Sequence, residues 1–204
     1  MKIIGLKGEA NAYILRRFDG VMLVDPSCNY EEIVEKISGL KLWGILLTHA
    51  HKNHISLIGR FNCPVYLHKD DYFLFIDDSL NGFKDSESKR EYDLNRLDLK
   101  LVDDDTKLEF VDKRVEVIHT PGHTKGSVCY YYDGKLYTGD TLTIKGAGFS
   151  KRKSHSDYQL KKSVKMLYER FSVNTIVCPG HGKDTTLLEI RQKNEKVRTI
   201  LKKE

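Results

Sequence analysis

The chain has 204 residues, of which 40% are hydrophobic, and its 34 basic and 29 acidic residues give a formal net charge of +5. A chain of this length can bury a substantial core, and no Pro/Ser/Gly-rich linker divides it, so we expect one domain over residues 1–204. No run of about 18 apolar residues and no signal-peptide pattern occurs, which argues against a membrane partner and favours a cytoplasmic protein.

The basic residues and the cysteines exclude two further classes. Much of the positive charge lies in residues 151–153 and in the tail at 191–203, without the interleaved aromatics of a nucleic-acid interface. The four cysteines lack C-x-x-C spacing, which argues against a disulfide framework or a structural zinc site. A mildly basic rim suits a small, anionic substrate. The sequence leaves open whether the chain forms a homo-oligomer.

In the first half of the chain, short strands are expected over residues 3–6, 11–16 and 21–25, followed by a helix over 31–37 whose apolar residues recur at helical spacing. A strand over 45–48, a short helix beginning at His54 with Asn53 as its N-cap, a strand over 64–67 and a helix over 69–75 come next. Residues 77–105 form a polar insertion, interpreted either as a lid over the site or as a surface loop without a role.

The second half repeats this order of elements. Strands are predicted over residues 107–110, 115–119, 127–132 and 135–137, a helix over 158–171, a strand over 175–178 and a final helix over 187–201. The last two strands of the meander are joined by the hairpin turn Asp133-Gly134. Two such halves would stack as helix, sheet, sheet and helix, which is an α/β fold of the four-layer αββα type.

Three histidines stand close together in T-H-A-H-K-N-H, residues 48–54. His49 and His51 share one side of an extended chain, and His54 in the first turn of the next helix can point back at the same space. Polar loop histidines without a ligand role are the alternative. Clustered neutral imidazoles are more typical of metal binding, so we expect a metal site here.

Three later motifs each place a polar residue in a glycine-containing turn after a predicted strand. They are T-P-G-H-T with His123, T-G-D-T-L with Asp140 and C-P-G-H-G with His181. Strand ends of one scaffold deliver such side chains to one rim. His49, His51 and His123 then form a three-imidazole set, and Asp140 can bridge from that set toward His54 and His181.

These motifs, in this order, resemble those of the metallo-β-lactamase superfamily. The resemblance covers about residues 11–194 and is greatest to the hydroxyacylglutathione hydrolase (glyoxalase II-like) branch. It implies the αββα sandwich and two metals, with Asp140 between them. Carried over, the metal ligands are His49, His51 and His123 at the first metal, and His54, His181 and Asp140 at the second. The family pattern H-x-H-x-D-H has an aspartate where this chain has Asn53, which is left as a weak ligand at most.

The ligand set predicts Zn²⁺, as one or two ions, or alternatively Fe²⁺ or Mn²⁺. The expected function is hydrolysis of a small thioester, ester or lactone through a metal-bound hydroxide, with Asp140 and His54 as catalytic residues. Two alternatives stay open. One is a mononuclear non-haem iron persulfide dioxygenase, in which His49, His123 and Asp140 would form a facial triad; the other is a metal-binding protein with little catalysis.

Other residues receive secondary assignments. Asp25, at a strand end, is expected either to orient a ligand histidine or to serve only in a turn. His68, His119 and His155 are predicted to be structural. Phe149 stands where the glutathione-hydrolase branch has a basic residue, a place that Lys151 or Arg152 would have to fill, and the chain ends at Glu204 without that branch's further helical region. A glutathione thioester is therefore expected to be a poor substrate.

Overall fold

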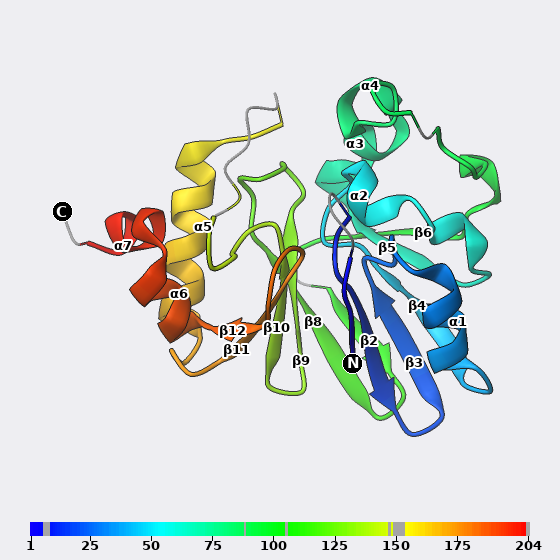
Figure 1. Ribbon diagram of the computed structural model, residues 1–204, viewed down its shortest axis with the longest axis horizontal. Helices are drawn as coiled ribbons and strands as arrows, with labels where there is room; N and C mark the ends of the chain where they lie inside the picture. Colours follow the sequence, from blue (N-terminus) through cyan, green and yellow to red (C-terminus); the bar gives the residue numbers. More distant parts are fainter. Residues whose placement is uncertain (6–8, 88, 105, 147, 149–153, 203–204) are drawn as a thin grey trace.

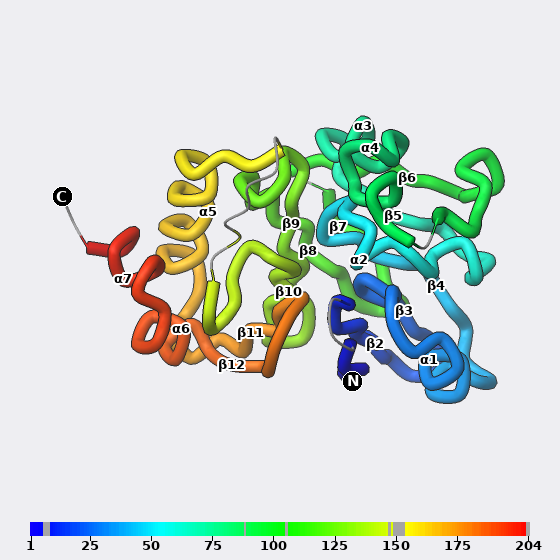
Figure 2. Tube along the Cα trace, turned by 45° about the horizontal axis from the view of Figure 1, so that its top comes forward, coloured from blue at the N-terminus to red at the C-terminus, as the bar shows by residue number. Residues whose placement is uncertain are grey.

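Two mixed six-stranded sheets pack face to face, and helices cover the outer face of each (Figure 1). The computed structural model describes residues 1–5, 9–87, 89–104, 106–146, 148 and 154–202. Helices α5, α6 and α7 lie on one side of the molecule and α1 on the other, also in the turned view of Figure 2. The layers are helix, sheet, sheet and helix, which confirms the αββα sandwich predicted from the sequence.

The first sheet has the strand order β1-β2-β3-β4-β5-β6. Its strands β1 to β3 pair antiparallel, whereas β3 to β6 pair parallel. The strands are β1 (Lys2–Ile3), β2 (Ala12–Arg17), β3 (Gly20–Val24), β4 (Lys41–Leu46), β5 (Val65–His68) and β6 (Leu99–Val102). The helices of this half are α1 (Tyr30–Ile37), α2 (Lys52–Ile55), η1 (Ile58–Arg60), η2 (Lys69–Asp71), α3 (Tyr72–Ile76), α4 (Asp78–Asn81) and η3 (Leu94–Arg96).

The second sheet has the order β12-β11-β10-β9-β8-β7, and only β10 and β11 pair parallel. Its strands are β7 (Lys107–Phe110), β8 (Lys113–His119), β9 (Val128–Tyr132), β10 (Lys135–Gly139), β11 (Ile176–Pro179) and β12 (Thr185–Thr186). The helices of this half are α5 (Asp157–Arg170), between β10 and β11, and α6 (Leu187–Lys193) and α7 (Glu195–Leu201), after β12. The predicted strand 107–110 agrees with β7 at both ends, and the hairpin turn Asp133-Gly134 joins β9 to β10 as expected.

Side-chain alternation on the strands separates three hydrophobic layers. Ile14 of β2 packs toward α1, whereas its neighbour Leu15 packs between the two sheets. On the far side of the second sheet, α5 buries Leu160, Val164 and Leu167 completely. Each such side chain contributes roughly 1.5–3 kcal/mol by leaving water. The helical stripe predicted from these residues is therefore the face that fixes α5 to its sheet.

The polar segment at 77–105 is more ordered than the sequence suggested. It contains α4, η3 and strand β6, and β6 pairs parallel with β5 at the edge of the first sheet. Phe83 of this segment is buried in the first core. Lys52 Nζ of α2 donates to Ser86 Oγ and lies over the Phe83 ring, so the segment packs against the histidine-rich region.

The boundaries of three further predicted elements differ from those in the structure. The final helix over 187–201 is divided at Asn194, whose side chain accepts a hydrogen bond from Val197 N at 3.1 Å and so starts a new helix, α7. Helix α2 begins at Lys52, which puts Asn53 inside the helix instead of at its N-cap. The N-terminal strand is short, and residue 6 of its predicted range lies outside the described residues.

The longest described helix, α5, has 14 residues. Within the part of the chain that the structure describes, no helix combines the length and the apolar character needed to cross a bilayer. All four cysteines are free thiols.

Candidate metal centre

Strand β4 delivers the histidine-rich loop, and Asp25 at the end of β3 fixes its start. The Asp25 carboxylate accepts hydrogen bonds from Thr48 N at 2.8 Å and from Thr48 Oγ1 at 2.6 Å. Its backbone φ of 47° is uncommon for a non-glycine residue and aims the side chain under the loop. The same carboxylate lies 2.8 Å from His54 Nδ1. Asp25 thus orients a histidine, the more specific of the two roles that the sequence left open.

Hydrogen bonds fix which nitrogen three of the histidines present. His54 Nδ1 faces Asp25, and His123 Nδ1 lies 2.8 Å from the carbonyl oxygen of Gly148. His49 Nδ1 lies 3.2 Å from Thr48 Oγ1, whose own proton goes to Asp25. Since each of these partners accepts, each ring carries its hydrogen on Nδ1. All three rings therefore turn Nε2 toward a common space, as metal-binding histidines do.

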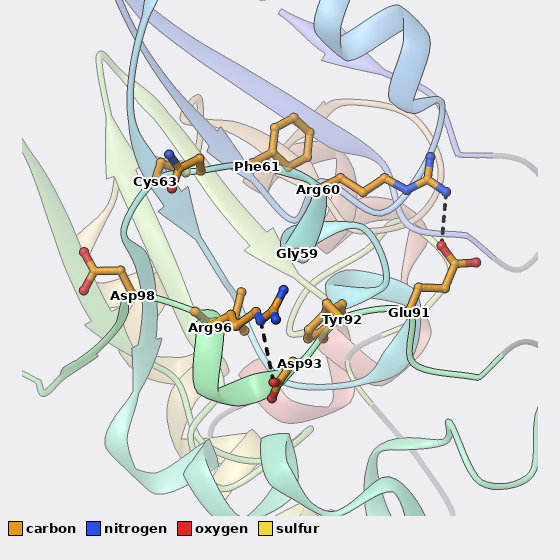
Figure 3. Close-up of a pocket in the computed structure, with 11 residues that line it drawn as sticks. Gly59, Arg60, Phe61, Cys63, Glu91, Tyr92, Asp93, Arg96 and Asp98 are labelled. Atoms are coloured by element: carbon orange, nitrogen blue, oxygen red, sulfur yellow. Dashed lines mark hydrogen bonds and ion pairs between the residues drawn. The ribbon is translucent and has the colours of Figure 1, made fainter.

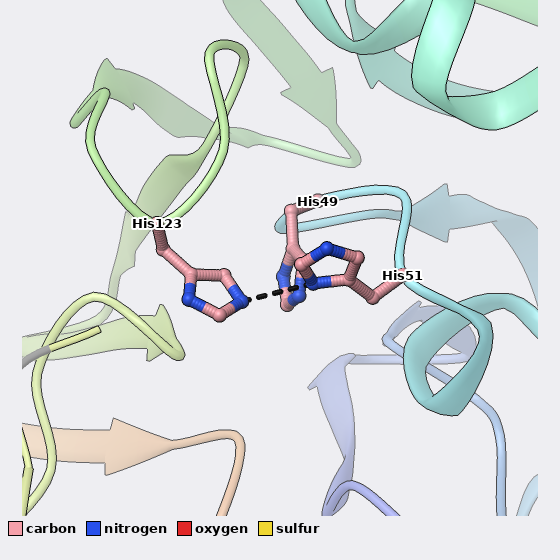
Figure 4. Close-up of side chains that lie close together, drawn as sticks. All are labelled: His49, His51 and His123. Carbon is pink, nitrogen blue, oxygen red and sulfur yellow. Dashed lines mark hydrogen bonds between the residues drawn. The ribbon is translucent and has the colours of Figure 1, made fainter. Parts of the chain in front are cut away.

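The first group of candidate ligands comprises His49, His51 and His123. One nitrogen from each lies within 4.8 Å of the other two. The rings come from two separate loops and point at one another (Figure 4), with His51 Nδ1 2.9 Å from His123 Nε2. All three residues are less than 10% exposed. Burial lowers the pKa of His49 and of His123, which favours the neutral form that binds metal.

Asp140 lies between this group and the remaining histidines. Its Oδ2 is 3.5 Å from His123 Nε2, whereas Oδ1 is 3.4 Å from His54 Nε2 and 3.5 Å from His181 Nε2. Burial alone would raise the pKa of this carboxyl, but His54, His123 and His181 hold it well below its usual range. Asp140 is therefore a fixed negative charge at the centre of the site.

His54 has the opposite electrostatic surroundings from His49. Burial by itself would lower its pKa, but the carboxylates of Asp25 and Asp140 on its two sides raise the pKa of His54 to about 10. Without a cation, the ring is thus an imidazolium held between two carboxylates.

His181 completes the convergence and shows where this chain departs from the family pattern. Its side chain is 39% exposed, and its Nε2 lies 3.0 Å from Asn53 Nδ2. The Asn53 backbone carbonyl accepts hydrogen bonds from Ala10 N and Ser27 Oγ, which ties this turn of α2 down. An amide hydrogen therefore points at the His181 nitrogen that a metal would use.

Two glycines let the strand ends approach this closely. A Cβ atom on Gly180 would lie 2.7 Å from both Asp140 Oδ1 and His54 Cε1. Gly139 adopts a φ of +48°, and a Cβ atom there would lie 2.3 Å from Thr48 Oγ1. The G-D and P-G-H motifs therefore need glycine because a larger residue would displace the candidate ligands.

The donors fit a divalent metal. His49 Nε2, His54 Nε2 and Asp140 Oδ1 are buried, and none of them makes a well-formed hydrogen bond among the described residues; His54 Nε2 and Asp140 Oδ1 have only ion-pair contacts of 3.4 Å or longer. Such atoms are costly to bury unless something outside the chain satisfies them. His49, His54 and Asp140 also form a second group whose donor atoms lie within 4.8 Å of one another. All six predicted ligands converge, and the two groups together support a divalent-metal site.

The histidines that are not candidate ligands, His68, His119 and His155, lie apart from this centre and have partners of their own. His68 Nδ1 accepts from Asp70 N at 3.3 Å, so its hydrogen is on Nε2, which donates to Asp104 at 2.9 Å. His119 stacks on His68 and donates from Nε2 to the Lys125 carbonyl. These hydrogen bonds account for the His68–Asp104–His119 cluster without a metal.

Other secondary residues have different outcomes. His155 Nε2 pairs with Asp157 Oδ1 at 2.5 Å. The predicted substrate-side residues Phe149, Lys151 and Arg152 lie outside the described residues. Asp71 was not predicted from the sequence, although its buried carboxylate touches both histidine loops. Its position beside Asp70 at the start of a predicted helix gave no indication of this contact.

A separate pocket of about 520 Å³ lies beside η1 and η3 and contains none of the histidines (Figure 3). Two ion pairs join charged residues of its rim, Arg60 with Glu91 at 3.1 Å and Arg96 with Asp93 at 3.9 Å. Burial raises the pKa of the Cys63 thiol to about 12, so this cysteine is not a nucleophile near neutral pH. The pocket thus has neither the metal ligands nor the reactive groups of the histidine centre.

Residues 6–181 match the family model of the metallo-beta-lactamase superfamily. The Bacillus subtilis (strain 168) protein described as "Probable metallo-hydrolase YqgX" is 32% identical over 195 residues, which cover 91% of each chain. The "Probable polyketide biosynthesis zinc-dependent hydrolase PksB" of the same strain is 28% identical over 79% of this chain and 67% of its own.

Two solved structures resemble the fold over almost the whole chain. The B3 metallo-beta-lactamase BLEG-1 is 29% identical, with a TM-score of 0.86 over 97% of this chain and 98% of its own. TTHA1623, solved in a di-iron-bound form, is 26% identical, with a TM-score of 0.79 over 96% of this chain and 99% of its own.

Proposed function

The chain belongs to the metallo-beta-lactamase superfamily, and we propose that it is a metal-dependent hydrolase of a small thioester, ester or lactone. The observation that supports this most is the set of buried candidate ligand atoms that face one space without well-formed hydrogen bonds among the described residues. A divalent metal there would acidify a water molecule and polarise a substrate carbonyl, which is the chemistry that such a hydrolysis needs.

We assign the ligands to two positions. The first metal position is held by His49, His51 and His123, and the second by His54 and His181, with Asp140 between the two. Asn53 contributes at most a weak amide ligand to the second position. Asp140 and His54 also act in catalysis. Asp140 provides a permanent negative charge beside the reacting group, and His54 contacts the Asp140 carboxylate and so orients it at the second position.

Proton transfer limits the substrate class. An amide leaving group must be protonated as it departs, and an aspartate in place of Asn53 would be a natural carrier for that proton. The amide of Asn53 cannot carry one, and Asp140 stays ionised because its pKa is held low. A thiolate needs little help, since an ordinary thiol has a pKa of about 8.5. We therefore favour thioesters and activated esters or lactones over amides.

Metal identity and branch are parts of the same proposal. Histidine and carboxylate ligands suit Zn²⁺ first, as one or two ions, and Fe²⁺ or Mn²⁺ as alternatives. PksB is described as zinc-dependent and TTHA1623 was solved with iron, so these two proteins support either metal. We also propose that the chain belongs to the glyoxalase II-like branch of the superfamily. We also propose a cytoplasmic enzyme with a small anionic substrate, either monomeric or homo-oligomeric.

A second candidate function rests on the contact between Asn53 and His181. If that hydrogen bond keeps the second position empty, a single Fe²⁺ at the first position would suit a persulfide dioxygenase with His49, His123 and Asp140 as its facial triad.

Elemental analysis of protein purified without added metal, combined with two assays, separates these functions. We expect bound zinc, hydrolysis of simple thioesters that a chelator abolishes and Zn²⁺ restores, and a kcat/KM for S-lactoylglutathione below about 10⁴ M⁻¹s⁻¹, the low end of the usual enzyme range. One iron per chain with oxygen consumption on a persulfide would establish the second candidate instead. Bound metal without turnover in either assay would establish the remaining alternative, a metal-binding protein with little catalysis.

A further inference from the structure

Asp71 ends η2, far from the histidines in sequence, and is 1% exposed. Its Oδ2 accepts hydrogen bonds from Ala50 N and from Thr124 Oγ1, each at 2.9 Å, and its Oδ1 accepts from Gly126 N at 2.7 Å. Ala50 lies between His49 and His51, and Thr124 follows His123. One carboxylate therefore holds both loops that carry the first metal position.

We propose that Asp71 is a positioning residue that sets the distance between the two histidine loops and thereby the metal affinity of the first position. This inference rests on the proposed metal-dependent function. It assigns Asp71 no contact with metal or substrate; it acts only through the backbone of Ala50 and Gly126 and the hydroxyl of Thr124.

The three donors explain why the residue is a carboxylate. Two are backbone N–H groups, which cannot exchange their roles, and they approach different oxygens of Asp71. An asparagine would turn its NH₂ group toward one of them and leave that donor unsatisfied, whichever way the amide faces. A carboxylate at position 71 can serve both loops at once because each of its oxygens accepts a hydrogen bond.

The cost of this arrangement indicates that it has a role. None of the three hydrogen-bond donors is a cation, and burial raises the pKa of Asp71 while the hydrogen bonds partly oppose that rise. A Cβ atom on Gly126 would lie 2.4 Å from Asp71 N, so the second loop packs directly on this turn. A buried carboxylate is unfavourable unless its hydrogen bonds compensate, and here those bonds connect the two loops.

The expected loss of metal affinity on substitution of Asp71 can be taken from comparable metal sites. Groups that hold a ligand histidine in place typically contribute 10–100-fold, roughly, to metal affinity. Asp71→Asn should therefore weaken Zn²⁺ binding at the first position by about that factor, because His123 is no longer held opposite His49 and His51.

Asn81→Ala is the matched control. Asn81 is also fully buried and also loses hydrogen bonds on substitution, with the Phe75 carbonyl, Asp78 Oδ1 and Phe83 N, but none of its hydrogen bonds among the described residues goes to a histidine loop. Zn²⁺ affinity of the metal-free full chain is measured by competition with a chelating indicator, and thermal stability is measured in parallel. Both variants should melt at lower temperature, whereas only Asp71→Asn should lose affinity.

A second pair keeps the test decisive if Asp71→Asn does not fold. Thr124→Val removes one donor to Asp71 and should lower first-position affinity, while Thr124→Ser keeps the hydroxyl and should restore it. Wild-type affinity in Asp71→Asn or Thr124→Val would overturn the positioning role and leave the proposed function standing. Failure of the wild-type chain to bind any of Zn²⁺, Fe²⁺ and Mn²⁺ would instead overturn the proposed function itself.

Discussion

The two proposed metal positions differ in how firmly the chain builds them. At the first, three buried histidines from two loops are fixed by hydrogen bonds, and burial lowers the pKa of His49 and His123. At the second, His54 lies between two carboxylates, and the partly exposed His181 receives a hydrogen bond from an amide. The first position thus offers His49 and His123 as neutral rings near pH 7, whereas at the second a raised pKa keeps His54 protonated and an amide hydrogen points at His181 Nε2.

Replacing a histidine of the first position tests the metal position that is more firmly built, and it should cause the largest change in metal affinity. His123→Ala removes one of three imidazoles from a site whose donors lie within 4.8 Å of one another. We expect Zn²⁺ affinity at the first position to fall by more than about a hundredfold, beyond what loss of a group that merely holds a ligand costs. Inductively coupled plasma analysis and chelator competition measure this loss.

His119→Ala is the control for that variant. His119 lies four residues earlier, and its ring bonds to Asp104 and the Lys125 carbonyl. It should keep full metal content, whereas full metal in His123→Ala would remove His123 from the ligand set.

The same contrast shows what the sequence could reveal. The motif histidines and Asp140 were predictable because each stands in a short pattern with glycine and follows a strand, and strand ends of one fold meet at one rim. The αββα layers were predictable because apolar periodicity alternated between strands and helices. These features are local, and local patterns are what a sequence displays.

The residues that distinguish the two positions were not visible in the same way. Asp71 meets Thr124 and Gly126 at separations of 53 and 55 residues, and Asn53 meets His181 across 128 residues. Strand β6 was missed because it is an edge strand whose two central residues are exposed, so its alternation is weak. Long-range contacts of single polar groups leave no periodic trace, and only the folded structure reveals them.

The pH dependence of metal binding should differ between the two positions. At neutral pH the lowered pKa values of His49 and His123 leave these rings unprotonated, so first-position affinity should change little above pH 7. His54, with a pKa raised to about 10, must release a proton before it can bind metal. Second-position affinity should therefore rise with pH, by up to about tenfold per unit between pH 7 and 9.

Calorimetry in two buffers of different ionisation enthalpy measures the protons released at each step. The Asp25→Asn variant removes a carboxylate that raises the pKa of His54, and it should flatten the rise. A cation bound at the first position should lower the pKa of His54, because a nearby positive charge disfavours an imidazolium. The rise of second-position affinity with pH should then end at a lower pH. Equal proton release at both positions would contradict the contrast drawn between them.

Restoring the family carboxylate tests the weaker side. Asn53→Asp adds a negative charge at the second position and removes the amide hydrogen that points at His181 Nε2. Affinity there should rise by about tenfold or more, since each 1.4 kcal/mol or so is a factor of ten and a carboxylate exceeds an amide as a ligand for a dication. Without metal, the new carboxylate and Asp140 both lie against His181 Nε2, so two like charges come close together and the apo protein should become less stable until a cation binds.

Asn53→Ala separates the two causes of that gain. It removes the hydrogen bond to His181 without adding charge, and no N-terminal cap is lost, because residue 53 lies inside α2. If Asn53→Ala raises second-position affinity as much as Asn53→Asp does, the contact of the amide with His181 is what weakens the second position. If only Asn53→Asp raises that affinity, the missing negative charge is the cause. Calorimetric titration of the three apo proteins decides, and two equivalents bound with the same affinity by all three would show that the second position never depended on residue 53.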